Sequence, residues 1–208
     1  MSTPKTAIIL IDPYNDFLHP NGKLTARLQD LTERNTIQHL KEVVRIARAN
    51  RVPIYYGLHQ QWAPGRFSGW RHMAPNQVRQ EETHYFEEGS HGAQIYEGLE
   101  PDVGNGDVVV SKHWCSDSFQ NTDLEYQLRQ RDIENLVFAG LTANTCLEST
   151  ARHGYELGYK ITILKDATAG FSKELTAAGE LVWPLFASVS RVREWEEGLK
   201  DEQGAHAV

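Results

Sequence analysis

Three side chains that can do chemistry each follow a short apolar run of the chain. Asp12 is the first polar residue after one run, Lys112 directly follows a second, and Cys146 comes shortly after a third. A carboxylate can move a proton, a thiolate can attack a carbonyl carbon, and an ammonium group can stabilise a thiolate. Singly, each has an ordinary explanation: a turn former, a solvated charge and a packing residue. Together they indicate a site for acyl transfer.

Cys146 lies in the first turn of a helix predicted over 143–157. The amino end of a helix carries a partial positive charge and unpaired backbone N–H groups. These features lower the pKa of a thiol and supply hydrogen-bond donors for a developing oxyanion. The position of Cys146 therefore favours a reactive thiol.

The apolar runs before these residues are continuous rather than alternating, which is typical of strands covered on both faces. Helical patterns separate the runs, so we expect crossover connections and a parallel sheet. The predicted fold class is α/β, a three-layer sandwich with a central, mostly parallel six-stranded sheet, in a single domain over 1–208. Ligands bind at the carboxyl ends of such strands. The six predicted strands are 7–11, 54–57, 108–111, 136–140, 161–164 and 188–191.

A long stretch, residues 59–106, separates the second and third predicted strands. Long insertions over strand ends usually carry a binding function. Arg66 and Arg71 of this insertion are either ligands for a substrate carboxylate or exposed loop arginines without a ligand. The aromatic rings and the histidine that follow a strand end or lie in the insertion either contact substrate or pack against neighbours. These substrate-binding candidates are Phe17, His59, Trp62, Trp114 and Phe119.

The composition sets limits on partners and compartment. The chain of 208 residues has a formal net charge of −7, and no basic cluster that could follow a phosphate backbone. The first apolar run is far too short to span a membrane and has no cleavage pattern after it. Two cysteines form no disulfide framework. We therefore expect a cytoplasmic protein with no nucleic-acid or membrane partner. A small-molecule substrate and a homo-oligomeric state, either dimer or tetramer, are separate expectations.

Three segments carry a resemblance to a known family. Residues 11–17 read Ile-Asp-Pro-Tyr-Asn-Asp-Phe, residues 106–112 read Gly-Asp-Val-Val-Val-Ser-Lys, and residues 140–146 read Gly-Leu-Thr-Ala-Asn-Thr-Cys. Their order and spacing resemble those of the isochorismatase-like cysteine hydrolases, and the similarity runs from about residue 6 to about residue 170.

The resemblance implies a role for each residue. Cys146 is the nucleophile, Asp12 the general base that returns the proton to the leaving nitrogen, and Lys112 the cation of a catalytic triad. A cis peptide bond falls between Leu141 and Thr142, and the backbone N–H groups of Thr142 and Cys146 form the oxyanion hole. The implied activity is hydrolysis of a C–N bond in a small amide, carbamoyl or ureide compound through a thioester.

The chain also departs from the pattern of the family. Nicotinamidases hold a metal through an Asp-x-His after the second strand, where this chain reads Leu-His-Gln-Gln at residues 58–61. One imidazole is too few ligands for a stable site, so we expect no metal and no cofactor. The presence of Cys146 argues against vinyl-ether hydrolysis, which needs no thiol. The stretch from Lys112 to Phe119 is about one residue longer than the family pattern, and this departure concerns the pocket contacts.

Two alternatives stay open at this point. The same pocket could open the ring of a lactam or cyclic imide. The chain could also be a non-catalytic oligomeric binding protein that has kept the fold, although a relic has no reason to retain Asp12, Lys112 and Cys146 together.

Overall fold

Six strands form one sheet in the computed structural model, which describes residues 5–205. Every neighbouring pair is parallel, and the order across the sheet is β3-β2-β1-β4-β5-β6. The predicted six-stranded sheet is confirmed, and it is wholly parallel. Its strands are β1 (Lys5–Ile11), β2 (Ile54–Gly57), β3 (Val108–Val109), β4 (Ile133–Leu141), β5 (Lys160–Ala169) and β6 (Ser188–Ser190).

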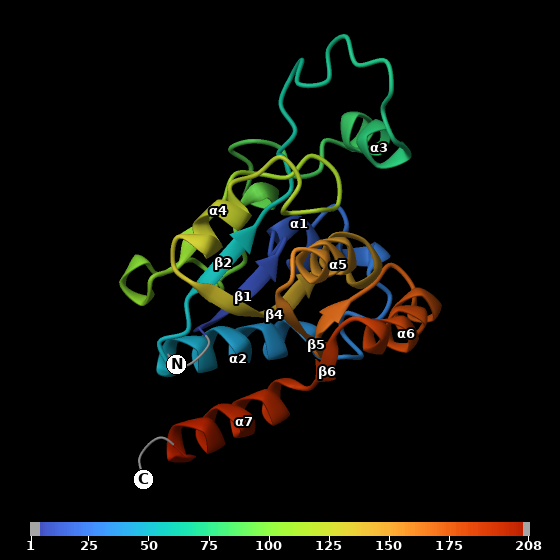
Figure 1. Cartoon of the computed structure of the whole chain (residues 1–208). Helices are drawn as coiled ribbons and strands as arrows, with labels where there is room; N and C mark the ends of the chain where they lie inside the picture. The colour runs from blue at the N-terminus through green and yellow to red at the C-terminus, as the bar shows by residue number, and fades with distance from the viewer. Residues whose placement is uncertain (1–4, 206–208) are drawn as a thin grey trace.

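Helices cover both faces of the sheet, which explains the continuous apolarity of the strands (Figure 1). Ile8 and Leu10 of β1 belong to the apolar cluster that includes α2 and α7, whereas Ile9 and Ile11 belong to the opposite cluster with α4 and α5. The helices are α1 (Asn15–Leu18), α2 (Thr36–Ala49), α3 (Pro75–Thr83), α4 (Leu124–Arg129), α5 (Glu148–Glu156), α6 (Lys173–Val182) and α7 (Val192–Ala205). Within residues 5–205, no helix combines the length and apolarity that crossing a bilayer requires.

The chain changes direction across the sheet between β1 and β4. It runs outward from β1 through β2 to β3, and then returns to β4 on the other side of β1. Gly140 of β4 has a φ of 113°, and a Cβ added there would lie 2.1 Å from the Ile11 carbonyl oxygen. Only glycine permits so close an approach. The carboxyl ends of β1 and β4 therefore meet at the topological switch point, where ligands bind in open parallel sheets.

The insertion between β2 and β3 lies over the carboxyl ends of the strands (Figure 1). It contains α3, an isolated bridge between Tyr14 and Ile95 joins it to the segment after β1, and a bridge between Trp62 and Glu87 joins two of its own segments. The residues of this insertion therefore form a cover above the switch point.

Candidate active site

Asp12 is placed by the turn that ends β1. Its φ of 48° is in the left-handed region, which aspartate tolerates better than most residues, and its N–H donates to the Gly57 carbonyl at 2.9 Å. The carboxyl group is fully buried, and its Oδ1 accepts a hydrogen bond from the His59 N–H at 2.5 Å. Its Oδ2 has no hydrogen-bond partner among residues 5–205. One carboxylate oxygen is thus anchored, and the other is free for chemistry.

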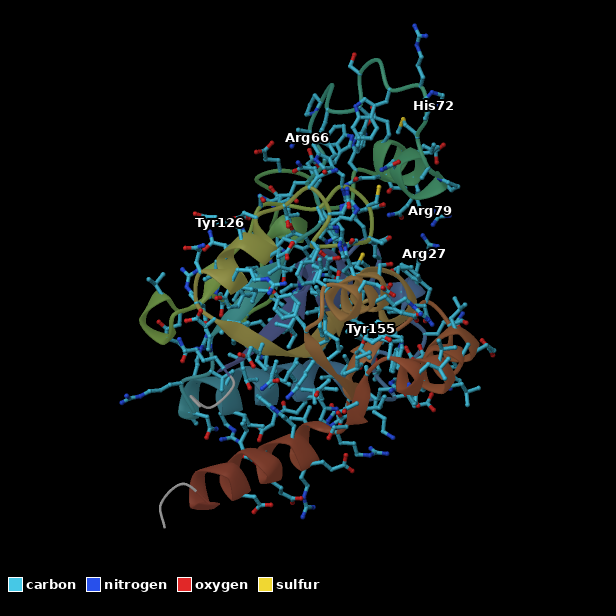
Figure 2. The ribbon with its side chains drawn as sticks, viewed as in Figure 1. Arg27, Arg66, His72, Arg79, Tyr126 and Tyr155 are labelled. Carbon is cyan, nitrogen blue, oxygen red and sulfur yellow. The ribbon has the colours of Figure 1, made fainter. Side chains whose placement is uncertain are left out.

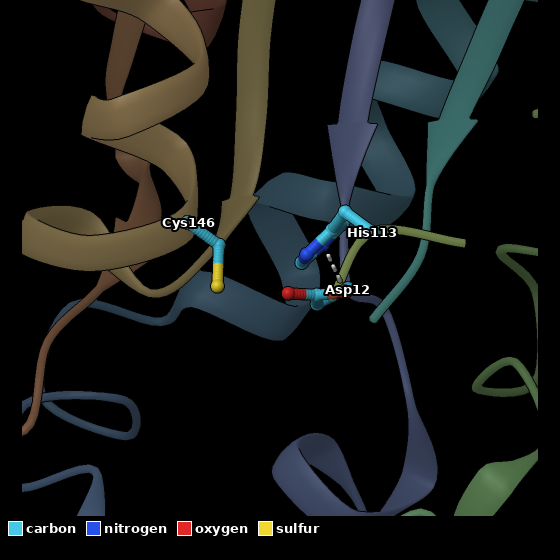
Figure 3. Close-up of side chains that lie close together, drawn as sticks. All are labelled: Asp12, His113 and Cys146. Atoms are coloured by element: carbon cyan, nitrogen blue, oxygen red, sulfur yellow. Dashed lines mark ion pairs between the residues drawn. The ribbon is translucent and has the colours of Figure 1, made fainter. Parts of the chain in front are cut away.

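Cys146 lies on the first turn of the helical segment that follows β4. The peptide bond between Leu141 and Thr142 is cis, as the resemblance implied. A π-helical turn (Ala143–Leu147) follows and leads directly into α5. The Cys146 side chain is buried, and its sulfur faces the Asp12 carboxylate (Figure 3).

The third member of the cluster is His113. The chain after β3 stays extended, and the His113 N–H donates to the Leu58 carbonyl at 2.9 Å. The buried ring places Nε2 3.3 Å from Asp12 Oδ1, as an ion pair rather than an aligned hydrogen bond, and Nδ1 3.1 Å from the Cys115 carbonyl oxygen. One side-chain atom each from Asp12, His113 and Cys146 lies within 4.8 Å of the other two (Figure 3).

His113 therefore takes the place that the sequence assigned to Lys112. Successive side chains of an extended segment point to opposite sides, so Lys112 points away when His113 points inward. Lys112 is half-buried, and its ammonium makes no ion pair or side-chain hydrogen bond with another residue in the range 5–205. The extra residue between Lys112 and Phe119 was the signal, because the family spacing counted back from Phe119 reaches His113.

The protonation of the cluster differs from the expectation of a lowered thiol pKa. Burial and, next, the Asp12 charge raise the pKa of the Cys146 thiol well above its usual value. The hydrogen bonds from Thr145 and from the Thr142 N–H oppose these effects without cancelling them. The helix terminus does not outweigh burial and a neighbouring anion, so the free protein holds Cys146 as a thiol.

The Asp12 carboxylate has the opposite effect on His113. Burial lowers the pKa of His113, but the neighbouring Asp12 carboxylate more than offsets burial and raises that pKa above its ordinary value. The Cys115 carbonyl only accepts hydrogen bonds, so Nδ1 carries a proton. The Asp12 carboxylate thus favours the charged form of His113 at the position where the resemblance implied a lysine.

His59 is buried in the wall of the same site. Burial and the nearby His113 lower its pKa to about 4, so its ring is neutral at physiological pH. Its Nδ1 lies 2.9 Å from the Gln60 carbonyl oxygen and donates to it, which leaves Nε2 as an acceptor without a partner among the described residues.

A cavity of about 280 Å³ opens above Cys146 and Asp12. A volume of this size suits a small molecule. Two of the predicted substrate-binding residues, Phe17 and His59, line it. The other lining residues are Leu24, Arg27, Pro75, Asn76, Arg79, Tyr85, Phe86, Ser116, Thr145 and Phe171. Most of this second group was not predicted from the sequence. Leu24 and Arg27 follow α1, and several others lie in or near α3, so only the tertiary structure brings these segments to one cavity.

The other three predicted pocket residues lie outside the cavity. The Trp62 ring stacks on His84, with ring centroids 3.6 Å apart, and its indole N–H donates to Glu81. Trp114 contacts the Trp70 ring, and Phe119 is buried in the apolar cluster beneath α4 and α5. Each of these three rings packs against a neighbour outside this cavity, so contact with substrate stays a prediction for them.

Two exposed arginines, Arg27 and Arg79, line the cavity (Figure 2). Neither forms an ion pair with a residue in the described part of the chain, and the Arg27 guanidinium lies 5.2 Å from the centre of the Phe171 ring. Arg66, by contrast, is paired with Glu88 at 2.7 Å, and Arg71 is exposed and outside the cavity. The unpaired positive charge therefore comes from two arginines that the sequence did not single out.

The fold and the site together define an α/β protein with a buried thiol and a carboxylate at the switch point of a parallel sheet. The isochorismatase-domain family profile matches residues 6–194, and the chain belongs to this family. The chain is 32% identical over 177 residues to the ureidoacrylate amidohydrolase RutB of Caulobacter vibrioides. This match covers 79% of this chain and 77% of that protein.

Solved structures have the same fold. A cysteine hydrolase from Pseudomonas syringae pv. phaseolicola is 23% identical with a TM-score of 0.78, and the match covers 97% of this chain and 99% of that one. The N-carbamoylsarcosine amidase from Thermoplasma acidophilum is 23% identical with a TM-score of 0.67, and the match covers 90% of this chain and 96% of that one.

Proposed function

We propose that this protein is a cysteine hydrolase that cleaves a C–N bond of a small carbamoyl, ureide or amide compound through a thioester. The observation that carries the proposal is the unpartnered Oδ2 of Asp12, buried beside the Cys146 thiol at the base of a cavity. The similarity to a ureidoacrylate amidohydrolase supports the same bond type.

In the first half of the reaction, the carbonyl carbon of the substrate lies above the Cys146 sulfur. Asp12 Oδ2 accepts the thiol proton as the sulfur attacks, so a thiolate forms only when a carbonyl is there to react with it. The oxyanion points toward the backbone N–H groups of Thr142 and Cys146. Asp12 then returns the proton to the departing nitrogen, and the C–N bond breaks to leave a thioester on Cys146.

In the second half, water attacks the thioester, and Asp12 accepts a proton from that water. The C–S bond breaks, and the proton passes to the sulfur, which restores the thiol. Asp12 thus acts as base and acid in both halves, and this role requires its Oδ2 to have no permanent partner.

His113 has a positioning and electrostatic role in this scheme. Its imidazolium faces Asp12 Oδ1 at 3.3 Å and offsets the charge that the carboxylate and the tetrahedral intermediate would otherwise concentrate in a buried site. The hydrogen bond from Nδ1 to the Cys115 carbonyl holds the ring in this orientation.

The substrate carries a carboxylate in addition to the bond that is cleaved. Arg27 and Arg79 line the cavity without anionic partners, whereas the positive charge of His113 is already matched by Asp12. Arginine pairs with carboxylates through two parallel hydrogen bonds. A ureido or carbamoyl acid satisfies both requirements, and the name of the RutB relative describes such a compound.

Ammonia release from a panel of small compounds tests the function. The panel pairs each ureido, carbamoyl or amide acid with its neutral methyl ester or amide, and includes nicotinamide and a cyclic imide. We expect turnover of at least one carboxylate-bearing C–N substrate and none of nicotinamide. Ring opening of the imide releases no ammonia, so the amide acid that it forms is measured by chromatography, and turnover confined to the imide would support ring opening.

Replacing either arginine should weaken substrate binding selectively. A charged hydrogen bond contributes about 1.5–3 kcal/mol, so Arg27→Met or Arg79→Met should raise KM for the acid at least about tenfold. The neutral analogue should be turned over as before, within about twofold, because it never used the guanidinium. Arg71→Met is the matched control, since this exposed arginine lies in the same insertion as Arg79 but outside the cavity. Equal losses for acid and neutral analogue would contradict the carboxylate assignment.

The reaction also favours a compartment. The Cys146 thiol must stay reduced to act, and the two free cysteines suit a reducing cytoplasm. The homo-oligomeric state remains a prediction, which sedimentation of the purified protein can test.

A further inference from the structure

The side chains of Asp12, His113 and Cys146 together form a ligand set for a metal ion. We propose that this cluster binds a zinc-type divalent cation, and that the bound ion inhibits the hydrolase by occupying the sulfur that must attack the substrate. The inhibitory half rests on the proposed function, whereas the binding half stands on the geometry alone.

The atoms present match the chemistry of zinc. Thiolate sulfur, imidazole nitrogen and carboxylate oxygen are its usual ligands, and three protein ligands with one open position make a common arrangement. The three candidate atoms lie within 4.8 Å of one another in a cluster of buried residues. The cavity of about 280 Å³ above them leaves the fourth position open to water or another small ligand.

Asp12 and His113 each offer a buried side-chain atom that accepts or donates no hydrogen bond within residues 5–205. Asp12 Oδ2 and His113 Nε2 have no hydrogen-bond partner among residues 5–205, although buried polar atoms are nearly always paired. The His59 Nε2 is a third unpartnered atom nearby, with its ring centroid 5.2 Å from that of His113. A cation would satisfy at least two of these atoms at once.

The surroundings also orient the ligands as metal sites do. A metal-binding histidine usually donates its other ring N–H to a carbonyl or carboxylate, which fixes the ring and aims the remaining nitrogen at the ion. His113 Nδ1 is held in this way by the Cys115 carbonyl at 3.1 Å. Asp12 is held by the hydrogen bond from the His59 N–H to its Oδ1.

The histidine is what makes the cluster able to bind metal. A lysine ammonium in the same place has no lone pair to offer and would repel a cation. His113 has both properties: protonated it pairs with Asp12, and neutral it is a ligand. When the ion binds, the Cys146 thiol loses its proton to solvent, and the sulfur lone pair forms the bond to the metal. Metal binding and nucleophilic attack therefore exclude each other, and the metal-free protein is the active form.

The binding experiment uses full-length protein carrying Cys115→Ser, which removes the exposed second thiol but keeps the backbone carbonyl that holds His113. Titration with zinc chloride by calorimetry should give one site per chain. Titration with cobalt chloride should show thiolate-to-metal charge-transfer absorption. Cys146→Ser, Asp12→Asn and His113→Lys, each added to this background and checked for an intact melting transition, should lower the zinc affinity at least about a hundredfold.

The activity experiment adds zinc to the working enzyme. Turnover should fall in proportion to the occupied sites, and excess EDTA should restore it fully. The proposal is overturned if zinc binds equally well without Cys146 or His113, if no site is found, or if zinc raises turnover. Failure of the proposed hydrolase function would give a different result. The substrate panel would show no turnover, while the charge-transfer band and the one-to-one zinc binding would persist.

Discussion

Cys146→Ala should abolish turnover of the true substrate. Removing the nucleophile of a covalent mechanism lowers kcat at least about a thousandfold. Without the sulfur no thioester forms, so the base and the oxyanion hole have no covalent step to assist. The fold should survive, since the change only shortens one buried side chain by its sulfur and costs about 1 kcal/mol in the free energy of unfolding. Steady-state kinetics and thermal melting of both proteins provide the comparison. Activity within tenfold of wild type would rule out the thioester.

Iodoacetamide labelling provides an independent test of the same residue. In a Cys115→Ser background, Cys146 should react slowly at neutral pH, because burial and Asp12 raise its pKa and keep it protonated. The rate should rise with pH as the thiolate fraction grows, and activity should be lost in step with labelling. Rapid labelling at neutral pH would contradict the raised pKa and favour a thiolate that is formed before substrate binds.

The second large effect separates the two neighbours Lys112 and His113. His113→Leu should lower kcat/KM at least about a hundredfold, because the buried Asp12 carboxylate loses its compensating charge. Lys112→Met should retain activity within about threefold, since its ammonium has no ion-pair partner among the described residues and does not line the cavity.

A rescue variant distinguishes charge from packing at this position. His113→Lys restores a cation beside Asp12 and should recover at least about tenfold over His113→Leu, whereas a purely structural role for the imidazole predicts no recovery. The reverse pattern, with Lys112→Met inactive and His113→Leu active, would reinstate the assignment made from the sequence.

The fold could be predicted because its signals are local. Each strand is a run of apolar residues that must be covered on both faces, and the intervening helical patterns permit only parallel connections. The observed strand β2 has the predicted bounds, while β1, β4 and β5 are longer than predicted because residues beyond the apolar cores still pair with neighbouring strands. The positions of Asp12 and Cys146 were likewise predictable. Asp12 directly follows an apolar run, and Cys146 lies in the first turn of a predicted helix.

The pocket was harder to predict because its walls come from segments without such signals. Phe17 was found through its closeness to Asp12, and His59 through its place after β2. Arg27 and Arg79 lie 52 positions apart and meet only when α3 folds over the strand ends. Trp62 was predicted to contact substrate because it is aromatic and lies in the insertion. In the structure its ring stacks on His84 and its indole N–H donates to Glu81.

The sequence alone thus predicted the parallel sheet and the placement of Asp12 and Cys146 at strand ends, since apolar periodicity and a residue's place after a strand depend on neighbours along the chain. Tertiary structure decided which of two adjacent basic residues enters the site. An extended segment turns one of them inward and the other outward, and the pairing of His113 with Leu58 and Gln60 on the neighbouring segment sets that choice. Register between distant segments, more than residue type, selected His113.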